Sequence, residues 1–498
     1  MKPNTTNRII FSFINNILRG FLVLFIGILI SRNLGPFDFG RFAFLTSTFI
    51  AISSLINLNT TSAYFTFASK KKRTKTFIYL FWVWVFLQIL LITFISLVLP
   101  SKILSLLWPD EKTMTILLAF FAIFFQHSIW TITSKLAEAS RKTFYSQTAN
   151  SIIVIIHLLL IILSVKYYIL SIELIFIFSI IEWLLISTYS FFLYDSINTK
   201  FKVNYKYIYL YFFKFYKFCL PLILFTVLSS IFLFLDRWII QFWGGAKLQS
   251  FYAISLQVSS FFLIGVTAIL KIFWKETSHL INKKKNKYLS ILYSRIIRNL
   301  YIVILTVSSI FFLWSNEIIN ILYGREYIPA ATLLSLLIFY PIFQSLNQIN
   351  SVIFLASEKT RILSNIGIAI TFLSLIFTFI IFYPVFEIFD NIQLQSLGVK
   401  ILFLGIIELL ITNIIISKFL NKKNEIVFFI ISFVLILTIN IILKNVISYF
   451  FDNFYLIVFF QFVFFLIIFL FTIQRNLSYI YLNKKLIKKY FKNIYQSL

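Results

Sequence analysis

A chain of 498 residues that is 60% hydrophobic and 12% charged, with a mean hydropathy of +0.93, is too apolar to be a soluble domain built around one core. Its formal net charge of +28 fits either a nucleic-acid-binding protein or basic loops at a membrane surface, so the position of the charges has to decide. Apolar runs of about 20 residues, the length of a helix that crosses the hydrocarbon core, recur along the sequence. We therefore expect an all-α polytopic membrane protein.

In chain order we predict about 14 transmembrane helices. The first run is interrupted by Asn15, Asn16 and Arg19 and has no small-residue cleavage site, so it is read as a span and not as a signal peptide. The predicted spans are 11–31, 42–67, 77–99, 114–136, 144–165, 172–194, 218–243, 250–273, 292–314, 330–355, 362–384, 397–417, 426–447 and 453–474.

The first two spans are joined by the short turn Leu34-Gly35-Pro36-Phe37-Asp38-Phe39-Gly40. Pro36 stops the first helix, while Gly35 and Gly40 let the chain reverse and pack closely. The first span also holds Arg19, whose insertion at a helix centre costs about 2.5 to 3.5 kcal/mol. Such a side chain normally faces a cavity, a partner or a ligand.

Four landmarks of the first half return in the second half at a shift that rises steadily from 209 to 217 residues. The turn at Gly35 matches Gly244, and the basic loop 70–75 matches 283–287. Six spans separate each landmark from its copy, so the two halves have the same orientation and a substrate path is expected between them. The predicted parts are an N-terminal six-helix lobe at 1–194, a basic cytoplasmic linker at 195–217, a C-terminal six-helix lobe at 218–420, and the last two helices with a basic tail at 421–498.

Lys and Arg gather in the loops on one side of the predicted membrane. Of the 45 Lys and Arg residues, 30 lie in segments on the side of the N-terminus and 7 on the other side. The positive-inside rule then places both termini in the cytoplasm and accounts for the charge without nucleic acid; the resemblance described below implies that this membrane is the inner membrane of a bacterial cell. The alternating Lys and Tyr residues of 195–217 suit single-stranded nucleic acid, but between two spans they favour contact with anionic lipids.

Polar residues follow helical spacing inside several spans. In the first span, Ser12, Asn15, Asn16 and Arg19 share one face, and the second, seventh, eighth and tenth spans show similar faces. We expect these faces to meet in one cavity between the halves; the alternative is interhelical hydrogen bonding. The candidate substrate-binding residues are Asn15, Asn16, Arg19, Asn57, Lys135, Arg237, Gln241, Gln257, Lys271, Gln344 and Gln348.

The charges within the spans favour an anionic ligand. The cations exceed the clear acids Glu182 and Glu408 if Asp236 pairs with the adjacent Arg237. Guanidinium groups bind phosphate with two parallel hydrogen bonds, whereas an exporter of organic cations would need carboxylates. The candidates for ion coupling are Asp236, Glu182 and Glu408.

Enzyme motifs are missing from the sequence. It has no Walker A loop, no His-Glu-x-x-His and no nucleophile elbow, and its one cysteine, Cys219, cannot form an internal disulfide or a paired-cysteine metal site. His127 and His157 fall in the fourth and fifth spans, as proton relays or polar core residues. We predict a protein that is not an enzyme and has no cofactor and no metal.

Two motifs resemble those of Wzx-type polysaccharide flippases. Ile30-Ser31-Arg32-Asn33-Leu34-Gly35-Pro36-Phe37-Asp38-Phe39-Gly40-Arg41-Phe42 is similar to their turn after the first helix, and Leu235-Asp236-Arg237-Trp238-Ile239-Ile240 followed by Gly244 to their seventh helix. The second turn departs from the pattern, with Gly245 in place of proline and Gln249 in place of glycine.

The resemblance implies the multidrug/oligosaccharidyl-lipid/polysaccharide (MOP) superfamily, with two six-helix lobes in a MATE-like V shape and alternating access. The implied substrate is an undecaprenyl-pyrophosphate-linked oligosaccharide, an anionic lipid-linked glycan for O-antigen, capsule or a similar polymer. Proton or cation coupling is also implied by the resemblance. Membrane lipids are expected partners, and a polysaccharide polymerase or export complex is a candidate partner.

Three other classes remain open at this point. A MATE-type multidrug or cation antiporter shares the implied fold but should have an acidic cavity. A major-facilitator antiporter should place its extra helix pair between the halves, whereas the extra pair here is terminal. A glycan polymerase or ligase should carry a large periplasmic loop, and no predicted loop on that side is long.

Overall fold

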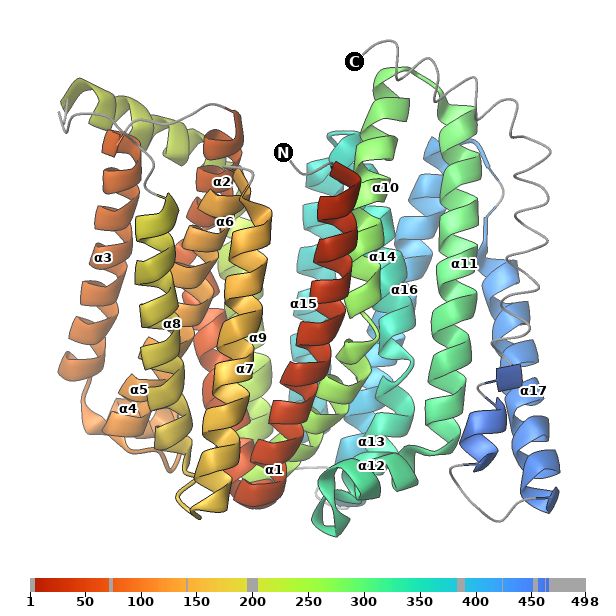
Figure 1. The fold of residues 1–498 in the computed structure, drawn as a ribbon. Helices are drawn as coiled ribbons and strands as arrows, with labels where there is room; N and C mark the ends of the chain where they lie inside the picture. Colours follow the sequence, from red (N-terminus) through yellow and green to blue (C-terminus); the bar gives the residue numbers. More distant parts are fainter. Residues whose placement is uncertain are drawn as a thin grey trace.

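The computed structural model describes residues 5–70, 75–139, 142–194, 205–382, 390–422, 424–450, 456–461 and 463–464. All regular structure in these ranges is helical (Figure 1). The first half contains α1 (Thr5–Asn57), α2 (Thr60–Lys70), α3 (Lys75–Val98), α4 (Ser101–Leu107), α5 (Thr113–Phe124), the π-helix η1 (Phe125–Trp130), α6 (Thr131–Ala139), α7 (Thr143–Lys166) and α8 (Ile172–Tyr194).

The second half has a similar series of helices, with its short irregular helix one place earlier. It contains α9 (Tyr205–Phe261), α10 (Ile264–Asn282), α11 (Asn286–Leu313), α12 (Ser315–Tyr323), the 3-10 helix η2 (Arg325–Tyr327), α13 (Ala330–Leu337), α14 (Tyr340–Ala356), α15 (Thr360–Phe382) and α16 (Asp390–Phe419), and is followed by α17 (Ile426–Phe450).

The equivalence of the two halves is visible in their irregularities. Each half opens with a double-length helix, α1 or α9, followed after a two-residue break by α2 or α10. Each half also has a short helix, α4 or α12, after its third long helix. The predicted all-α fold with two repeated lobes is thereby confirmed, while the residue boundaries of the lobes stay a prediction.

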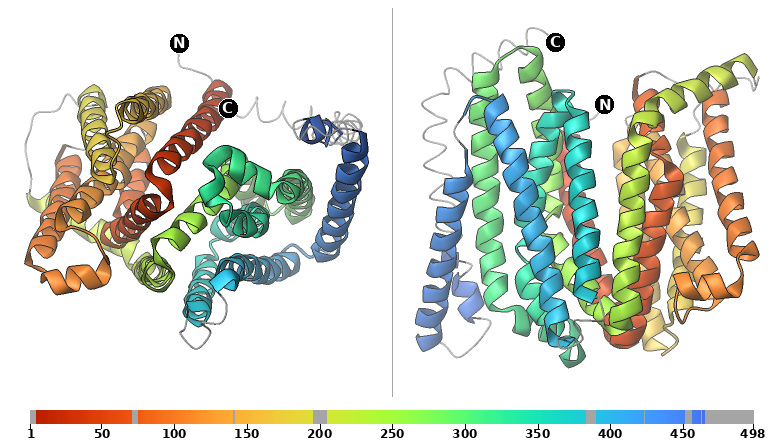
Figure 2. Two further views of the ribbon diagram at one scale, coloured as in Figure 1. Left: turned by 90° about the horizontal axis from the view of Figure 1, so that it is seen from below. Right: turned by 180° about the vertical axis from the view of Figure 1, so that it is seen from behind.

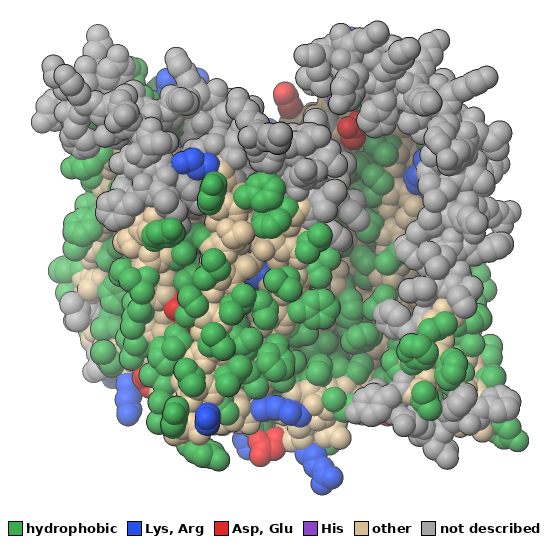
Figure 3. Space-filling model, in the orientation of Figure 1, with side chains coloured by type: hydrophobic (Ala, Val, Ile, Leu, Met, Phe, Trp, Pro, Cys, Tyr) green, Lys and Arg blue, Asp and Glu red, His purple; other side chains and the backbone are tan. Residues whose placement is uncertain are grey.

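The protein is a multi-pass membrane protein. Among the described residues, 10 helices are long and apolar enough to span a membrane, and two of these, over Ile14–Asn57 and Ile223–Phe261, have 44 and 39 residues, enough for two crossings each. Hydrophobic side chains cover the middle of the surface in Figure 3, with most charged side chains toward its upper and lower edges. Most of the predicted last span, 453–474, lies outside the described residues, so the count of 14 stays a prediction.

The two double-length helices reverse at equivalent glycines. Gly35 has φ 75° and ψ 172°, and Gly245 has φ 75° and ψ 173°. This conformation is almost restricted to glycine because a Cβ atom would clash with the backbone. The match of Gly35 with Gly244 was therefore wrong by one residue, and Ala246 occupies the place of Pro36.

The halves meet at the end of the bundle that holds these two glycines, here called the turn face. In Figures 1 and 2 the two groups of helices converge there and stand apart at the opposite end, the N-terminal face, where α1 begins. Tyr327 donates a hydrogen bond of 2.7 Å to the carbonyl of Ser31, and Arg32 donates one of 2.6 Å to the carbonyl of Ile321. These bonds join the halves across the turn face.

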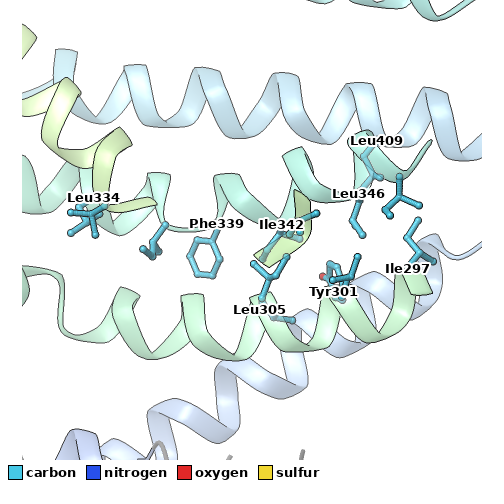
Figure 4. Packing of buried hydrophobic residues seen from close by; sticks show 14 of the residues in the cluster. Ile297, Tyr301, Leu305, Leu334, Phe339, Ile342, Leu346 and Leu409 are labelled. Carbon is cyan, nitrogen blue, oxygen red and sulfur yellow. The ribbon is translucent and has the colours of Figure 1, made fainter. Parts of the chain in front are cut away.

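The largest hydrophobic cluster explains why α1 stays attached to the second half. Its buried members from α1 include Ile26 and Ile30, and they pack in the same cluster as Leu305 and Phe339 of the second half. Figure 4 shows the part of this cluster between α11, α13, α14 and α16. The first segment of α1 is thus placed between the halves, where its polar residues can face both.

Candidate functional site

A cavity of about 660 Å³ lies between the halves toward the N-terminal face, and we call it the N-side cavity. Its walls come from α1, α6, α7, α9 and α10, together with the end of η1. It is polar on several sides, because its lining residues include Asn16, Arg19, Trp130, Ser134, Ser146, Gln147, Asn150, Gln257 and Ser260.

Arg19 is the charged side chain of this cavity. Within the part of the chain that the structure describes, its guanidinium forms no hydrogen bond and no ion pair, and none of the cavity's lining residues is acidic. A guanidinium held at membrane depth among neutral amides and hydroxyls lacks a counter-charge of its own. The N-side cavity is therefore suited to an anion with several hydrogen-bonding groups around it.

A second cavity of about 430 Å³ follows α1 toward the turn face, and we call it the turn-side cavity. His157 and Glu182 lie in its wall, with Nδ1 of the histidine 3.1 Å and 2.9 Å from the two carboxylate oxygens. Arg237 lines the same cavity, and its guanidinium lies 4.4 Å from the centre of the Tyr252 ring. Glu182, a candidate for ion coupling, is thus already bonded to a neighbouring helix.

The predicted pairing of Asp236 with Arg237 was wrong. Asp236 accepts a hydrogen bond of 2.8 Å from Nζ of Lys400, and Lys400 donates a second bond of 2.7 Å to the hydroxyl of Thr378. Thr378 also donates to Asp236, which closes a triangle joining α9, α15 and α16. The side chain of Lys400 is 2% exposed, so the partner of this carboxylate is buried.

Sequence reasoning missed Lys400. Its signal was the same as that of Arg19, a single cation within an apolar run, since it falls in the predicted span 397–417. The sequence interpretation assigned Asp236 to the adjacent Arg237 instead.

Of the predicted cavity residues, Asn16, Arg19 and Gln257 line the N-side cavity, and Arg237 and Gln257 line the turn-side cavity. Asn15 is buried and instead joins α1 to α7, donating to the carbonyl of Gln147 at 3.2 Å and accepting from Ser151 at 2.9 Å. For Asn15 the alternative of interhelical hydrogen bonding describes the contacts better than a cavity lining.

The remaining candidates lie away from both cavities or cannot be placed. Asn57 ends α1 and bonds the first turn of α2 through Thr60 and Thr61, and the side chain of Lys271 lies outside the described residues. Neither cavity includes Lys135 of α6, Gln241 of α9, Gln344 and Gln348 of α14, or Glu408 of α16. Their assignment to a substrate or ion site stays a prediction. The described residues contain no cluster of His, Cys, Asp and Glu that could hold a metal ion.

The sequence matches no protein-family model and no curated protein sequence. By fold, the chain is similar to the lipid II flippase MurJ in an inward closed conformation, at 19% identity and a TM-score of 0.68, over 94% of this chain and 99% of that one. It is also similar to an inward-facing multidrug resistance MATE family transporter of the MOP superfamily, at 13% identity and a TM-score of 0.63, over 81% and 96%.

A MOP superfamily transporter from Pyrococcus furiosus, whose description notes a reverse polarity of the binding pocket, matches at 12% identity and a TM-score of 0.51, over 85% of this chain and 98% of that one. The chain therefore has the fold of MOP superfamily transporters. Because all three identities are low, the comparison concerns the fold and leaves the substrate to be argued from the cavities.

Proposed function

We propose that the protein is a flippase that moves undecaprenyl-pyrophosphate-linked oligosaccharide units, of O-antigen or capsule type, across the bacterial inner membrane by alternating access. The observation that carries the proposal is Arg19, a cation in a 660 Å³ polar cavity between the two halves, for which the described part of the chain provides no carboxylate partner. The similarity in fold to a flippase of a lipid-linked molecule, over 94% of the chain, supports the same class of substrate.

The lining of the N-side cavity matches the parts of such a substrate. A guanidinium presents paired N–H donors to a pyrophosphate. The amides of Asn16, Gln147 and Asn150 offer donors and acceptors for sugar hydroxyls, and the indole of Trp130 offers a flat face for a sugar ring. The isoprenoid tail would stay in the bilayer, where hydrocarbon needs no protein site.

The halves are bonded together at the turn face, so in this conformation the N-side cavity lies toward the opposite, N-terminal face. If the positive-inside rule holds and the N-terminal face is cytoplasmic, the N-side cavity receives substrate from the cytoplasmic leaflet. Release on the other side then requires the bonds of Tyr327 to Ser31 and of Arg32 to Ile321 to break. These two contacts are the observable markers of the inward state.

One observation favours a MATE-type cation antiporter as the second candidate. Glu182 is a carboxylate in the wall of the turn-side cavity, and a cationic drug would seek such a group. Its bond to His157 and the presence of Arg237 in the same wall reduce its attraction for an organic cation. The flippase would bind an anionic ligand and the antiporter a cationic one, so binding experiments with ligands of opposite charge distinguish them.

Binding to the purified protein tests the proposal. We expect undecaprenyl pyrophosphate to bind, and Arg19→Ala to weaken binding about 10- to 100-fold, the value of a hydrogen bond to a charged group. Arg19→Lys should lose less, because the charge survives while the paired donors do not. Arg361→Ala, at an exposed arginine near the start of α15, is the matched control and should bind as the unmodified protein does.

A lipophilic cation such as tetraphenylphosphonium serves as the competing ligand. Tight binding of this cation, together with undecaprenyl pyrophosphate binding that is unaffected by Arg19→Ala, would favour the antiporter and refute the flippase.

A further inference from the structure

The two cavities are successive segments of one route along α1. Along the first segment of α1, before Gly35, the N-side cavity is lined by residues from Asn16 to Leu24 and the turn-side cavity by residues from Val23 to Ile30; the turn-side cavity is also lined by α1 residues after the turn, from Phe39 to Ile50. From Asn16 to Ile30 the helix rises about 21 Å, most of the hydrocarbon thickness. Each segment has its own arginine, Arg19 in one and Arg237 in the other.

Among the residues that the structure describes, two line both cavities, Val23 of α1 and Gln257 of α9. They come from opposite halves of the protein, because α1 begins the first half and α9 the second. A pair of side chains that faces both cavities stands at the boundary between them. Relative movement of the halves would therefore change this boundary directly.

Gly27 holds the side chain of Gln257 in this position. A Cβ atom built on Gly27 would lie 1.9 Å from Nε2 of Gln257, so the amide rests directly against the glycine backbone. Any larger residue at position 27 would force the amide to move. In this conformation the amide therefore packs against the backbone of Gly27, a contact that leaves the side chain able to rotate away.

The amide of Gln257 also has unused hydrogen-bonding capacity. Across the described ranges it forms no hydrogen bond with another residue, and its side chain is half-buried between the two cavities. An amide N–H₂ supplies two donors, which phosphate oxygens accept. Rotation of its own side chain is therefore enough for Gln257 to contact an anion in the N-side cavity or in the turn-side cavity.

We propose that Gln257, seated on Gly27 and facing Val23, is an inner gate between two anion stations, with Arg19 at the first and Arg237 at the second. A pyrophosphate group passes from one guanidinium to the other as the amide rotates and donates to it. The order of the stations rests on the proposed function, whereas the gate itself is a property of the cavities. The gate can therefore be tested without any lipid-linked glycan.

Cysteine labelling measures the gate. In a background with Cys219→Ser, the variant Ser134→Cys reports on the N-side cavity and Ser179→Cys on the turn-side cavity. The protein in lipid nanodiscs is treated with a membrane-impermeant methanethiosulfonate reagent that carries a sulfonate. We expect Ser134→Cys to react rapidly and Ser179→Cys slowly. Gln257→Ala should raise the rate at position 179 about tenfold and leave the rate at position 134 unchanged.

Two further variants separate a gate from a general loosening of the fold. Gln257→Met keeps the side-chain volume and should keep position 179 protected, and Ser250→Ala, on α9 but in the lining of neither cavity, should change neither rate. Equal rates at positions 134 and 179 in the starting protein, or no effect of Gln257→Ala at position 179, would overturn the gate.

Inorganic pyrophosphate tests the second station. In the Gln257→Ala protein, millimolar pyrophosphate should slow labelling at position 179, and adding Arg237→Ala should remove that protection. Protection that persists without Arg237, or no protection at all, would overturn the second station. Neither the labelling experiment nor the pyrophosphate experiment uses a lipid-linked substrate. Their failure would therefore be distinguishable from a failure of the proposed function.

Discussion

Gly244 and Gly245 are adjacent, yet only Gly245 has the backbone conformation that requires glycine. We expect Gly245→Ala to destabilise the protein by about 1 to 3 kcal/mol, because alanine must adopt a strained backbone there. Gly244→Ala should cost less, since the new methyl group meets side-chain atoms of Phe382 and Leu248, which can move. Thermal unfolding in detergent measures both, and an equal loss would contradict the assignment of Gly245 as the partner of Gly35.

Single residues show what the sequence could and could not indicate about the site. Arg19 and Arg237 line the two cavities, and the sequence singled them out because a cation within an apolar run is conspicuous, while their role in binding stays a prediction. Asp236 was given the wrong partner because adjacent helical residues point about 100° apart and do not face each other. Its true partner, Lys400, is 164 positions away, and no local pattern reveals a contact between α9 and α16.

The triangle of Asp236, Thr378 and Lys400 predicts a non-additive pair of mutations. Lys400→Met should destabilise the protein by about 3 to 5 kcal/mol, because it leaves a buried carboxylate without its cation. Adding Asp236→Asn removes that charge and should restore most of the stability. The unfolding temperatures of the two single variants and the double variant measure the interaction between Asp236 and Lys400. Simple addition of the two single effects would show that the ion pair contributes little.

At the scale of elements, the connection between α16 and α17 is held to α11 by charge. Glu425 accepts a hydrogen bond of 2.7 Å from each of Lys422 and Arg298, and Lys422 also donates one of 2.6 Å to Ser294. Burial would raise the pKa of the Glu425 carboxyl, but the bonds from Lys422 and Arg298 outweigh burial and lower it below its usual value.

A lowered carboxyl pKa fixes the direction of a pH effect. The unfolded chain binds the proton of Glu425 more readily than the folded protein does, so this stabilisation is present above the ordinary glutamate pKa and is lost as the pH falls through the lower, folded value. We expect Glu425→Gln to be less stable at neutral pH, with a difference from the starting protein that shrinks toward acid. Thermal unfolding against pH measures this, and a difference that grows toward acid would refute it.

The helices were predictable to different degrees. Long apolar runs gave the spanning helices, because hydrophobic length is a property of the local sequence. The predicted span 114–136 is present as the apolar stretch Thr113–Lys135, but the π-helix η1 within it was not predicted, and neither were the short helices α4 and α12. A π-helix adds one residue to a turn without changing composition, and its stability depends on packing, so the sequence carries little trace of it.

At the scale of the whole molecule, the sidedness of the membrane is the first open prediction. Reporter fusions after Lys287 should be cytoplasmic, and fusions after Lys112 or Lys247 periplasmic, because most Lys and Arg residues lie on the side of the N-terminus. A fusion after Lys206 should also be cytoplasmic. A periplasmic signal there would contradict two halves of equal orientation.

The repeat of the molecule was predictable, but the way its halves close was not. A drifting match between landmarks identified two parallel halves, because duplicated turns keep their residues. The contact of Tyr327 with Ser31 joins residues 296 positions apart, and the division of the expected single cavity at Val23 and Gln257 depends on how α1 packs against α9. Such contacts form only when the halves dock, so no periodicity in the sequence predicts them.

Translocation in proteoliposomes tests the central claim most directly. A fluorescent undecaprenyl-pyrophosphate disaccharide is placed in both leaflets, and its movement is followed by reduction of the fluorophore with an impermeant reagent. The account predicts that the protein moves the lipid between leaflets, that Arg19→Ala abolishes this movement, and that Arg19→Lys retains part of it. Translocation by Arg19→Ala at the rate of the unmodified protein would contradict the account.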